Sequence, residues 1–231
     1  MDSRLQPAYP AYAGTALSVE QRERVLRNTY WLLALSMVPT VLGAWIGVSS
    51  GIMAAMGPGI SLLVFFVGAF GLMFAVEKYK NQAAGVPLLL AFTFFMGLML
   101  SRLLGVVLSM KDGASLVMMA FAGTGVIFLG MASLSSIIKR DLSSMGKFLF
   151  IGMILLIIAS IANMFLMSSS LMITLSVIAI GIFSAFILHD LKRVKDGEET
   201  NYISATMGVY ISLYNVFSAL LSLFGIAGSR D

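Results

Sequence analysis

The sequence lacks cysteine altogether and contains little charge. With no cysteine among its 231 residues, the chain can form no disulfide, no thiolate metal site and no cysteine nucleophile. Charged residues make up only 11% of the chain, against about 25% in a typical soluble domain. Hydrophobic residues account for 59%, and the mean hydropathy is +0.95. This composition excludes an ordinary soluble domain and predicts a polytopic membrane protein of the all-α class.

Recognisable catalytic motifs are missing as well. The chain contains no HExxH helix, no glycine-rich phosphate loop and no GxSxG motif. Intramembrane aspartyl catalysis needs two carboxylates that share a site, whereas the apolar runs offer only Asp190, at an edge. We therefore predict that the protein is not an enzyme and needs no cofactor. The net charge of +4 does not indicate a nucleic-acid partner, because the basic residues lie beside apolar runs, where a topology signal places them.

Long apolar runs dominate the rest of the chain. A helix needs about 20 mostly apolar residues to cross a bilayer, and seven runs of suitable length are joined by short connections. They are Tyr30–Val48, Gly59–Val76, Val86–Leu108, Leu116–Ile138, Phe148–Met167, Leu171–His189 and Tyr202–Ile226. We predict a seven-transmembrane-helix bundle over residues 28–231, embedded in the lipid bilayer, with the last helix at its centre.

The first 27 residues form the only sizeable polar segment. Prolines, tyrosines and small residues without periodicity predict a largely disordered tail. Ser18 and Gln21 have the spacing of a capping box, which predicts a helix through residues 19–28. The sequence leaves open whether this helix lies at the membrane interface or extends the first span.

Lysine and arginine in the short loops indicate the orientation of the chain in the membrane. Basic residues cluster before the first span and in the loops after the second, fourth and sixth: Arg22, Arg24, Arg27, Lys78, Lys80, Lys139, Arg140, Lys147, Lys192, Arg193 and Lys195. The alternate loops carry only Lys111. This alternation predicts a cytoplasmic N-terminus and a C-terminus on the opposite side.

The most unusual chemistry lies between Phe183 and Phe224. We expect the sixth helix to end at His189, the only histidine, and Asp190. In the last helix, small and polar residues recur at steps of three and four, which places them on one face: Ser204, Gly208, Ser212, Asn215, Ala219 and Ser222. Such a face predicts contact with neighbouring helices inside a bundle, and whether it does more than pack stays open.

Other polar residues interrupt the apolar runs. Arg102 lies in the third run and needs a partner, water or an interface; near the outer end of its helix it can reach that interface. We interpret Asn163 and Asn215 as hydrogen-bonding groups between helices. Gly43 and Gly47 form a GxxxG pair, which is a weak indication of dimerisation.

Acidic residues gather after the sixth run, and they admit two interpretations. They are Asp190, Asp196, Glu198 and Glu199. Carboxylates can bind calcium, but this spacing does not match an EF-hand loop, and Lys192, Arg193 and Lys195 compete for them. Solvated loop charge is the simpler interpretation.

The segment HDLKRVKDGEETNYISATMGVYISLYNVFSALL resembles the transmembrane Bax-inhibitor-motif family, in particular its bacterial YccA-like branch. The family pattern has an aspartate closing the sixth helix, a charged loop, an Asn-Tyr-Ile opening to the seventh helix, and a tyrosine and a later asparagine within that helix. The matching residues are Asp190, Glu198 in the loop, Asn201, Tyr202, Ile203, Tyr210 and Asn215. Residues 25–36, VLRNTYWLLALS, also resemble that branch.

The resemblance implies two activities. Some family members are calcium-permeable leak channels that a pair of aspartates on the last two helices closes in a pH-sensitive way. Here the first position is Asp190, while Ser212 occupies the second, so the pair is incomplete. YccA-like proteins are instead associated with the FtsH-type membrane AAA protease, as substrate and modulator. The resemblance therefore favours a bacterial inner-membrane protein that modulates membrane-protein quality control, with a pH-modulated calcium or cation leak as the alternative.

On this basis we define candidate residues for a gate or polar core: Asp190, His189, Ser212, Asn215, Tyr210 and Arg102. Asp190 is expected to face the polar stripe of the last helix. The Ser212 hydroxyl is expected to donate a hydrogen bond to it.

Overall fold

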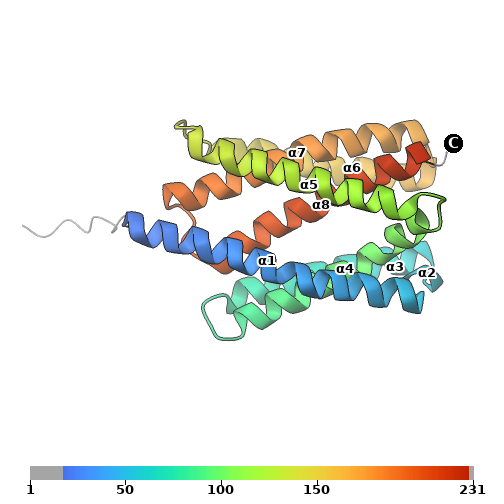
Figure 1. Cartoon of the computed structure of the whole chain (residues 1–231), viewed down its shortest axis with the longest axis horizontal. Coiled ribbons are helices and arrows are strands. Elements are labelled where there is room, and N and C mark those ends of the chain that lie inside the picture. Colours follow the sequence, from blue (N-terminus) through green and yellow to red (C-terminus); the bar gives the residue numbers. More distant parts are fainter. Residues whose placement is uncertain (1–17, 229–231) are drawn as a thin grey trace, which may run out of the picture.

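The computed structural model describes residues 18–228 (Figure 1). Seven long helices and one short helix make up this part of the chain. They are α1 (Val19–Ser50), α2 (Ile52–Ala55), α3 (Pro58–Tyr79), α4 (Gly85–Leu108), α5 (Gly113–Ile137), α6 (Met145–Leu166), α7 (Ser169–Asp196) and α8 (Tyr202–Gly228). All seven long helices are long and apolar enough to cross a membrane, which confirms the predicted class and number of spans. Residues 1–17, most of the predicted tail, lie outside the described residues.

Helix α1 shows whether the polar segment before the first apolar run forms a separate interfacial helix or extends the first span. Ser18 and Gln21 form the predicted capping box, in which the Ser18 hydroxyl accepts from the Gln21 N–H and the Gln21 side chain accepts from the Ser18 N–H. From there the helix runs without a break for 32 residues. The segment before the apolar run therefore extends the first span as one continuous helix.

Helix α8 lies at the centre of the bundle, as predicted. It packs against α1, α3 and α4 on one side and against α5 and α7 on the other. Figure 1 shows α8 crossing between these two groups. Val209, Val216 and Leu221 on this helix are fully buried. Helix α6, by contrast, has no buried residue and packs chiefly against α7.

The two glycines of the GxxxG pair pack within the chain, so the structure gives them a use other than dimerisation. A Cβ atom on Gly43 would overlap the Phe94 carbonyl oxygen of α4. On the other side of the contact, a Cβ atom on Gly97 of α4 would overlap the Thr40 carbonyl oxygen of α1. These glycines bring α1 and α4 into close backbone contact.

The expected end of the sixth span at His189 and Asp190 is wrong. Helix α7 continues to Asp196 and ends at Gly197, which has φ 83° and donates its N–H to the Val194 carbonyl at 3.1 Å. Lys192 and Asp196 form an ion pair one turn apart on this extension. The charged residues end the apolar run, whereas the helix ends only at the glycine.

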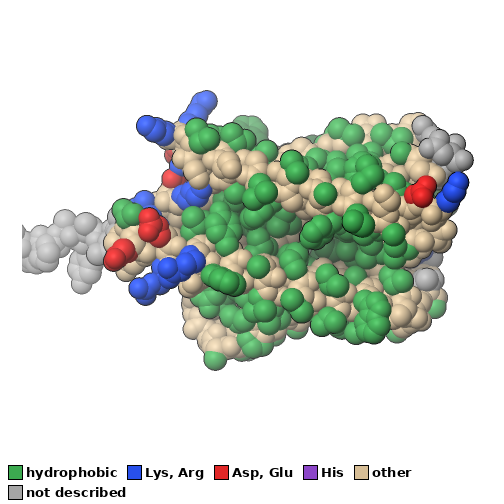
Figure 2. Space-filling model, viewed as in Figure 1, with side chains coloured by type: hydrophobic (Ala, Val, Ile, Leu, Met, Phe, Trp, Pro, Cys, Tyr) green, Lys and Arg blue, Asp and Glu red, His purple; other side chains and the backbone are tan. Residues whose placement is uncertain are grey.

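Charged side chains are gathered at the ends of the bundle, and most of them lie at the end where α1 begins (Figure 2). Between the ends, the visible face is mainly hydrophobic and otherwise uncharged. Large apolar side chains such as Trp31, Trp45 and Phe74 are exposed in this belt. Exposed apolar area of this extent is suited to lipid rather than to water.

Candidate functional site

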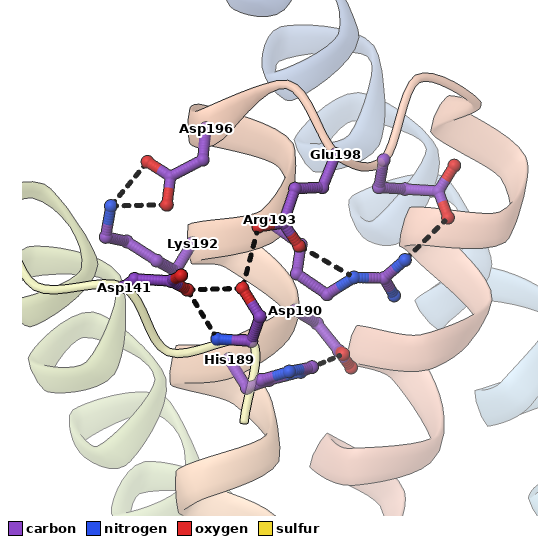
Figure 3. A network of polar contacts seen from close by, with 9 residues as sticks. Asp141, His189, Asp190, Lys192, Arg193, Asp196 and Glu198 are labelled. Carbon is purple, nitrogen blue, oxygen red and sulfur yellow. Dashed lines mark hydrogen bonds and ion pairs between the residues drawn. The ribbon is translucent and has the colours of Figure 1, made fainter. Parts of the chain in front are cut away.

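His189 and Asp190 lie side by side in the last two turns of α7 (Figure 3). The His189 Nδ1 atom is 3.3 Å from Asp190 Oδ1, and the two side chains are only 10% and 18% exposed. A buried carboxylate needs a hydrogen-bonding partner, and the imidazole supplies one.

The Asp190 carboxylate packs against Gly208 of α8. A Cβ atom placed on Gly208 would lie 2.9 Å from Asp190 Oδ2, closer than a carbon and an oxygen normally pack. The absence of a side chain at Gly208 thus lets the carboxylate approach the α8 backbone. Asp190 does face the small-residue stripe of the last helix, and Gly208 is the member of the stripe that it faces.

Ser212 does not donate to Asp190, contrary to our expectation. Its hydroxyl donates to the Gly208 carbonyl of its own helix at 3.1 Å, and the side chain is buried. Ser212 lies one turn beyond Gly208, and this step along α8 separates it from the carboxylate. The predicted pair of Asp190 and Ser212 is therefore not formed, and Asp190 contacts Gly208 instead.

The imidazole of His189 also reaches α6. A Cβ atom on Gly146, in the first turn of that helix, would lie 2.8 Å from His189 Nε2. Through its two ring nitrogens, His189 thus lies between the start of α6 and the Asp190 carboxylate. Gly146 and Gly208 were both missed as partners of this pair, because sequence alone does not reveal which glycines contact which side chain.

Tyr210 fixes α8 to α1 and α4. Its hydroxyl lies 2.8 Å from Thr40 Oγ1 of α1 and 3.3 Å from the Thr93 carbonyl oxygen of α4, and its ring packs edge-on against Phe92. The Tyr210 hydroxyl donates to the Thr93 carbonyl, and the Thr40 hydroxyl also lies 2.7 Å from the Ser36 carbonyl oxygen of its own helix. Tyr210 belongs to the polar core, where it joins three helices.

Asn215 does not bridge two helices, so this expectation is wrong. Its amide donates to the Ile211 carbonyl of α8 at 2.8 Å. Asn163 is likewise used locally, because its side-chain oxygen accepts from the Ser168 N–H between α6 and α7. Both asparagines line a cavity of about 510 Å³ between α6, α7 and α8, far along α8 from Asp190.

Arg102 is not part of the site at Asp190. It lies six residues before the end of α4, at the opposite end of the bundle, and its side chain is exposed. Its guanidinium Nη1 donates to the Ser61 hydroxyl of α3 at 3.3 Å.

The family-motif loop ties the ends of several helices together. Asn201 caps α8, because its side-chain oxygen accepts from the N–H groups of Ile203 and Ser204 at 2.9 and 3.2 Å. The same side chain donates to Asn81 Oδ1, in the α3–α4 loop, at 2.8 Å. Tyr202 opens α8 and accepts a hydrogen bond from the Thr206 hydroxyl at its carbonyl. Asn201 therefore caps α8 and links the start of this helix to the α3–α4 loop.

Glu198 joins this loop to the connection between α5 and α6. The Ser143 hydroxyl lies between Asp141 and Glu198, at 3.1 Å from Glu198 Oε1. Glu198 also pairs with Arg193 at 3.6 Å (Figure 3). Both the Ser143 hydroxyl and the Ser143 N–H donate to the Asp141 carboxylate. These two hydrogen bonds, the hydroxyl's having the larger effect, hold the pKa of Asp141 below its ordinary value.

A network of ion pairs thus uses most of the acidic residues that admitted a calcium interpretation. Lys192 holds Asp196, and Arg193 holds Glu198 and Glu199. Lys195 points to the end of α5, where it donates to the Ser135 hydroxyl at 2.7 Å. Within residues 18–228, no three histidine or carboxylate side chains are grouped so that they could hold a metal ion.

These features define a multi-pass membrane protein whose last two helices meet at a pair formed by a buried histidine and a half-buried aspartate. The family model described as "Inhibitor of apoptosis-promoting Bax1" matches residues 22–229. The chain belongs to this Bax inhibitor family and to its YccA-like branch.

Relatives match nearly the whole chain. An Escherichia coli protein named "Modulator of FtsH protease YccA" is 36% identical over 214 residues, which cover 93% of this chain and 94% of that protein. An "Uncharacterized membrane protein" of Vibrio cholerae is 37% identical over 215 residues, with 91% and 93% covered. A Neisseria meningitidis protein is 35% identical over 226 residues, with 96% and 99% covered.

Proposed function

We propose that this chain is an inner-membrane protein that modulates an FtsH-type membrane AAA protease, and is itself a substrate of it, in membrane-protein quality control. The observation that carries the proposal is the similarity to the Escherichia coli protein named as a modulator of FtsH protease, which spans 93% of this chain. The similarity extends over nearly the whole chain, and the family model matches residues 22–229, which reach from α1 to α8; this extent supports a shared mode of action.

The charge distribution supports an orientation with the N-terminus in the cytoplasm and the C-terminus in the periplasm. The clustered basic residues of α1, of the α3–α4 and α5–α6 connections and of the end of α7 lie at one end of the bundle. At the other end, the α4–α5 connection has Lys111 beside Asp112. Basic loops face the cytoplasm, so the network around His189 and Glu198 would lie on the cytoplasmic side, where the AAA domain of such a protease acts.

The experiment is a turnover measurement in cells that contain the protease. Expression of this chain should slow degradation of a model membrane substrate, and the chain should co-purify with the protease. Removal of residues 1–20 should leave membrane insertion intact and slow degradation of the chain itself, because the composition of this segment predicts the unstructured handle that an AAA protease needs. Unchanged substrate turnover together with absent co-purification would overturn the modulator proposal; unchanged degradation of the truncated chain would overturn the substrate proposal.

A cation leak is the alternative, and the half-buried Asp190 favours it. A carboxylate that is 18% exposed at the end of a membrane helix, next to the backbone of α8, could interact with a passing cation. Calcium flux into liposomes that contain the purified chain, compared with the Asp190→Asn variant, tests this function. Flux that depends on Asp190 would support the leak; equal permeability of both proteoliposome samples and empty liposomes would exclude it.

A further inference from the structure

A second cavity, of about 300 Å³, lies at the end of the bundle away from the start of α1. Helices α2, α3, α4, α6 and α8 contribute its walls, which are mainly apolar and include Leu62, Phe65, Met99 and Met164. Arg102 and Ser61 also line it, and both lie close to the helix ends at this side of the bundle. The cavity reaches inward to Tyr214, near the midpoint of α8. It therefore has a charged entrance and an apolar interior.

The charge of Arg102 has no counter-charge within the described part of the chain. Its only polar contact there is the neutral Ser61 hydroxyl, at 3.3 Å. A guanidinium carries five N–H donors, and this contact uses one of them. Arg102 is exposed near the end of its helix, so its guanidinium can reach the membrane interface, where phospholipid headgroups lie. The unused donors of Arg102 are thus available to an anion beside an apolar cavity.

We propose that this cavity binds a diacyl phospholipid. The phosphodiester accepts hydrogen bonds from Arg102, whose planar fork of donors matches phosphate oxygens. One acyl chain enters the cavity beside Phe65 and Met99. A partner helix is about 10 Å across and does not fit a cavity of this volume, whereas an acyl chain is narrow enough to enter it with part of its length. The site is independent of the protease proposal and of which end faces the cytoplasm.

The test uses the full chain, purified in detergent and stripped of lipid. Its thermal unfolding is followed during titration with phosphatidylglycerol, with inorganic phosphate and with diacylglycerol. A ligand that binds the folded state raises the midpoint of unfolding. We expect phosphatidylglycerol to raise it at the lowest concentration, because this lipid alone offers both the phosphate and the acyl chains.

Three variants separate the two parts of the site. Arg102→Gln should weaken phosphatidylglycerol binding about tenfold, since a hydrogen bond to a charged group is lost. Met99→Trp keeps Arg102 but fills the cavity, and it should weaken binding as well. Lys111→Gln removes a cation at the same end but outside the cavity, and it should bind as the wild type does.

Two results would overturn the proposal. One is wild-type affinity for phosphatidylglycerol in Arg102→Gln or in Met99→Trp; the second variant keeps the test decisive if the first does not fold. The other is an equal effect of inorganic phosphate or of diacylglycerol on the wild type, which would mean a simple anion site or unspecific lipid contact.

Discussion

At the residue scale, the contact between Asp190 and Gly208 sets how α7 and α8 meet. The carboxylate occupies the space that a side chain at position 208 would need. Because Asp190 is also held by His189, it cannot move away without losing that partner. The effect of a substitution at position 208 on stability should therefore depend on which residue occupies position 190.

We predict that Gly208→Ala lowers the free energy of unfolding by about 1–3 kcal/mol, the usual cost of overpacking. Gly181→Ala on α7 is the matched control, because a Cβ there meets nothing within 4 Å. Thermal unfolding in detergent measures both. In Asp190→Ala, which clears the space, the added Gly208→Ala change should cost much less. Equal costs of Gly208→Ala in the wild type and in Asp190→Ala would contradict the contact.

A second residue-scale prediction concerns Asp141. Its pKa is lowered by the Ser143 hydroxyl and N–H, so its ionised form stabilises the loop above the ordinary pKa of about 3.8, and this contribution is lost as the pH falls through the lowered value. Ser143→Ala removes the hydroxyl and should raise the pKa of Asp141 toward its ordinary value. A carboxyl-carbon NMR titration measures this pKa, with Ser136→Ala as the control. An unchanged pKa would show that the hydroxyl has no such effect.

The sequence could not provide these residue contacts. The stripe on the last helix correctly identifies the face toward Asp190, since Gly208 and Ser212 both belong to it. Which of the two meets the carboxylate depends on how far α7 slides along α8, and helical spacing contains no information about that shift. Similarly, a buried asparagine satisfies its amide equally well on a neighbouring helix or on its own backbone, and Asn215 uses its own.

At the element scale, apolar runs predicted where the helices cross the membrane but not where they end. Five of the seven spans agree with the helices to within three residues at both ends, whereas α1 begins 11 residues before its apolar run. Helix α7 exceeds its run by seven residues, from His189 to Asp196, because a helix that leaves the lipid can continue in water. The capping box at Ser18 was predictable, because its side-chain bonds are local.

Asn201 allows an element-scale prediction, because it holds α8 with its oxygen and the α3–α4 loop with its amide nitrogen. Asn201→Asp keeps the cap but loses the donor to Asn81, while Asn201→Ala loses both. Hydrogen exchange should therefore increase around residues 80–84 in both variants, and in the first turn of α8 only in Asn201→Ala. The expected cost of losing the cap is about 1 kcal/mol. Faster exchange at the start of α8 in both variants would contradict this division.

At the scale of the whole molecule, the basic end of the bundle predicts the topology. Reporter fusions after Lys139 and Lys195 should have cytoplasmic activity, and a fusion at Asp231 should have periplasmic activity. A fusion after Lys111 should also be periplasmic and serves as an internal check. Cytoplasmic activity at Asp231 together with periplasmic activity at Lys139 would reverse the orientation. Cytoplasmic activity at both positions would mean that one helix does not cross.

The central position of α8 has a consequence for the order of biosynthesis. Helix α8 is made after α1 to α7, yet both groups of helices pack against it, and Thr40, Thr93 and Asp190 meet their α8 partners only then. Until α8 is inserted, the earlier helices lie in the membrane without the helix that both groups pack against. A chain that stalls before the insertion of α8 therefore leaves the surfaces of both helix groups that pack against α8 uncovered.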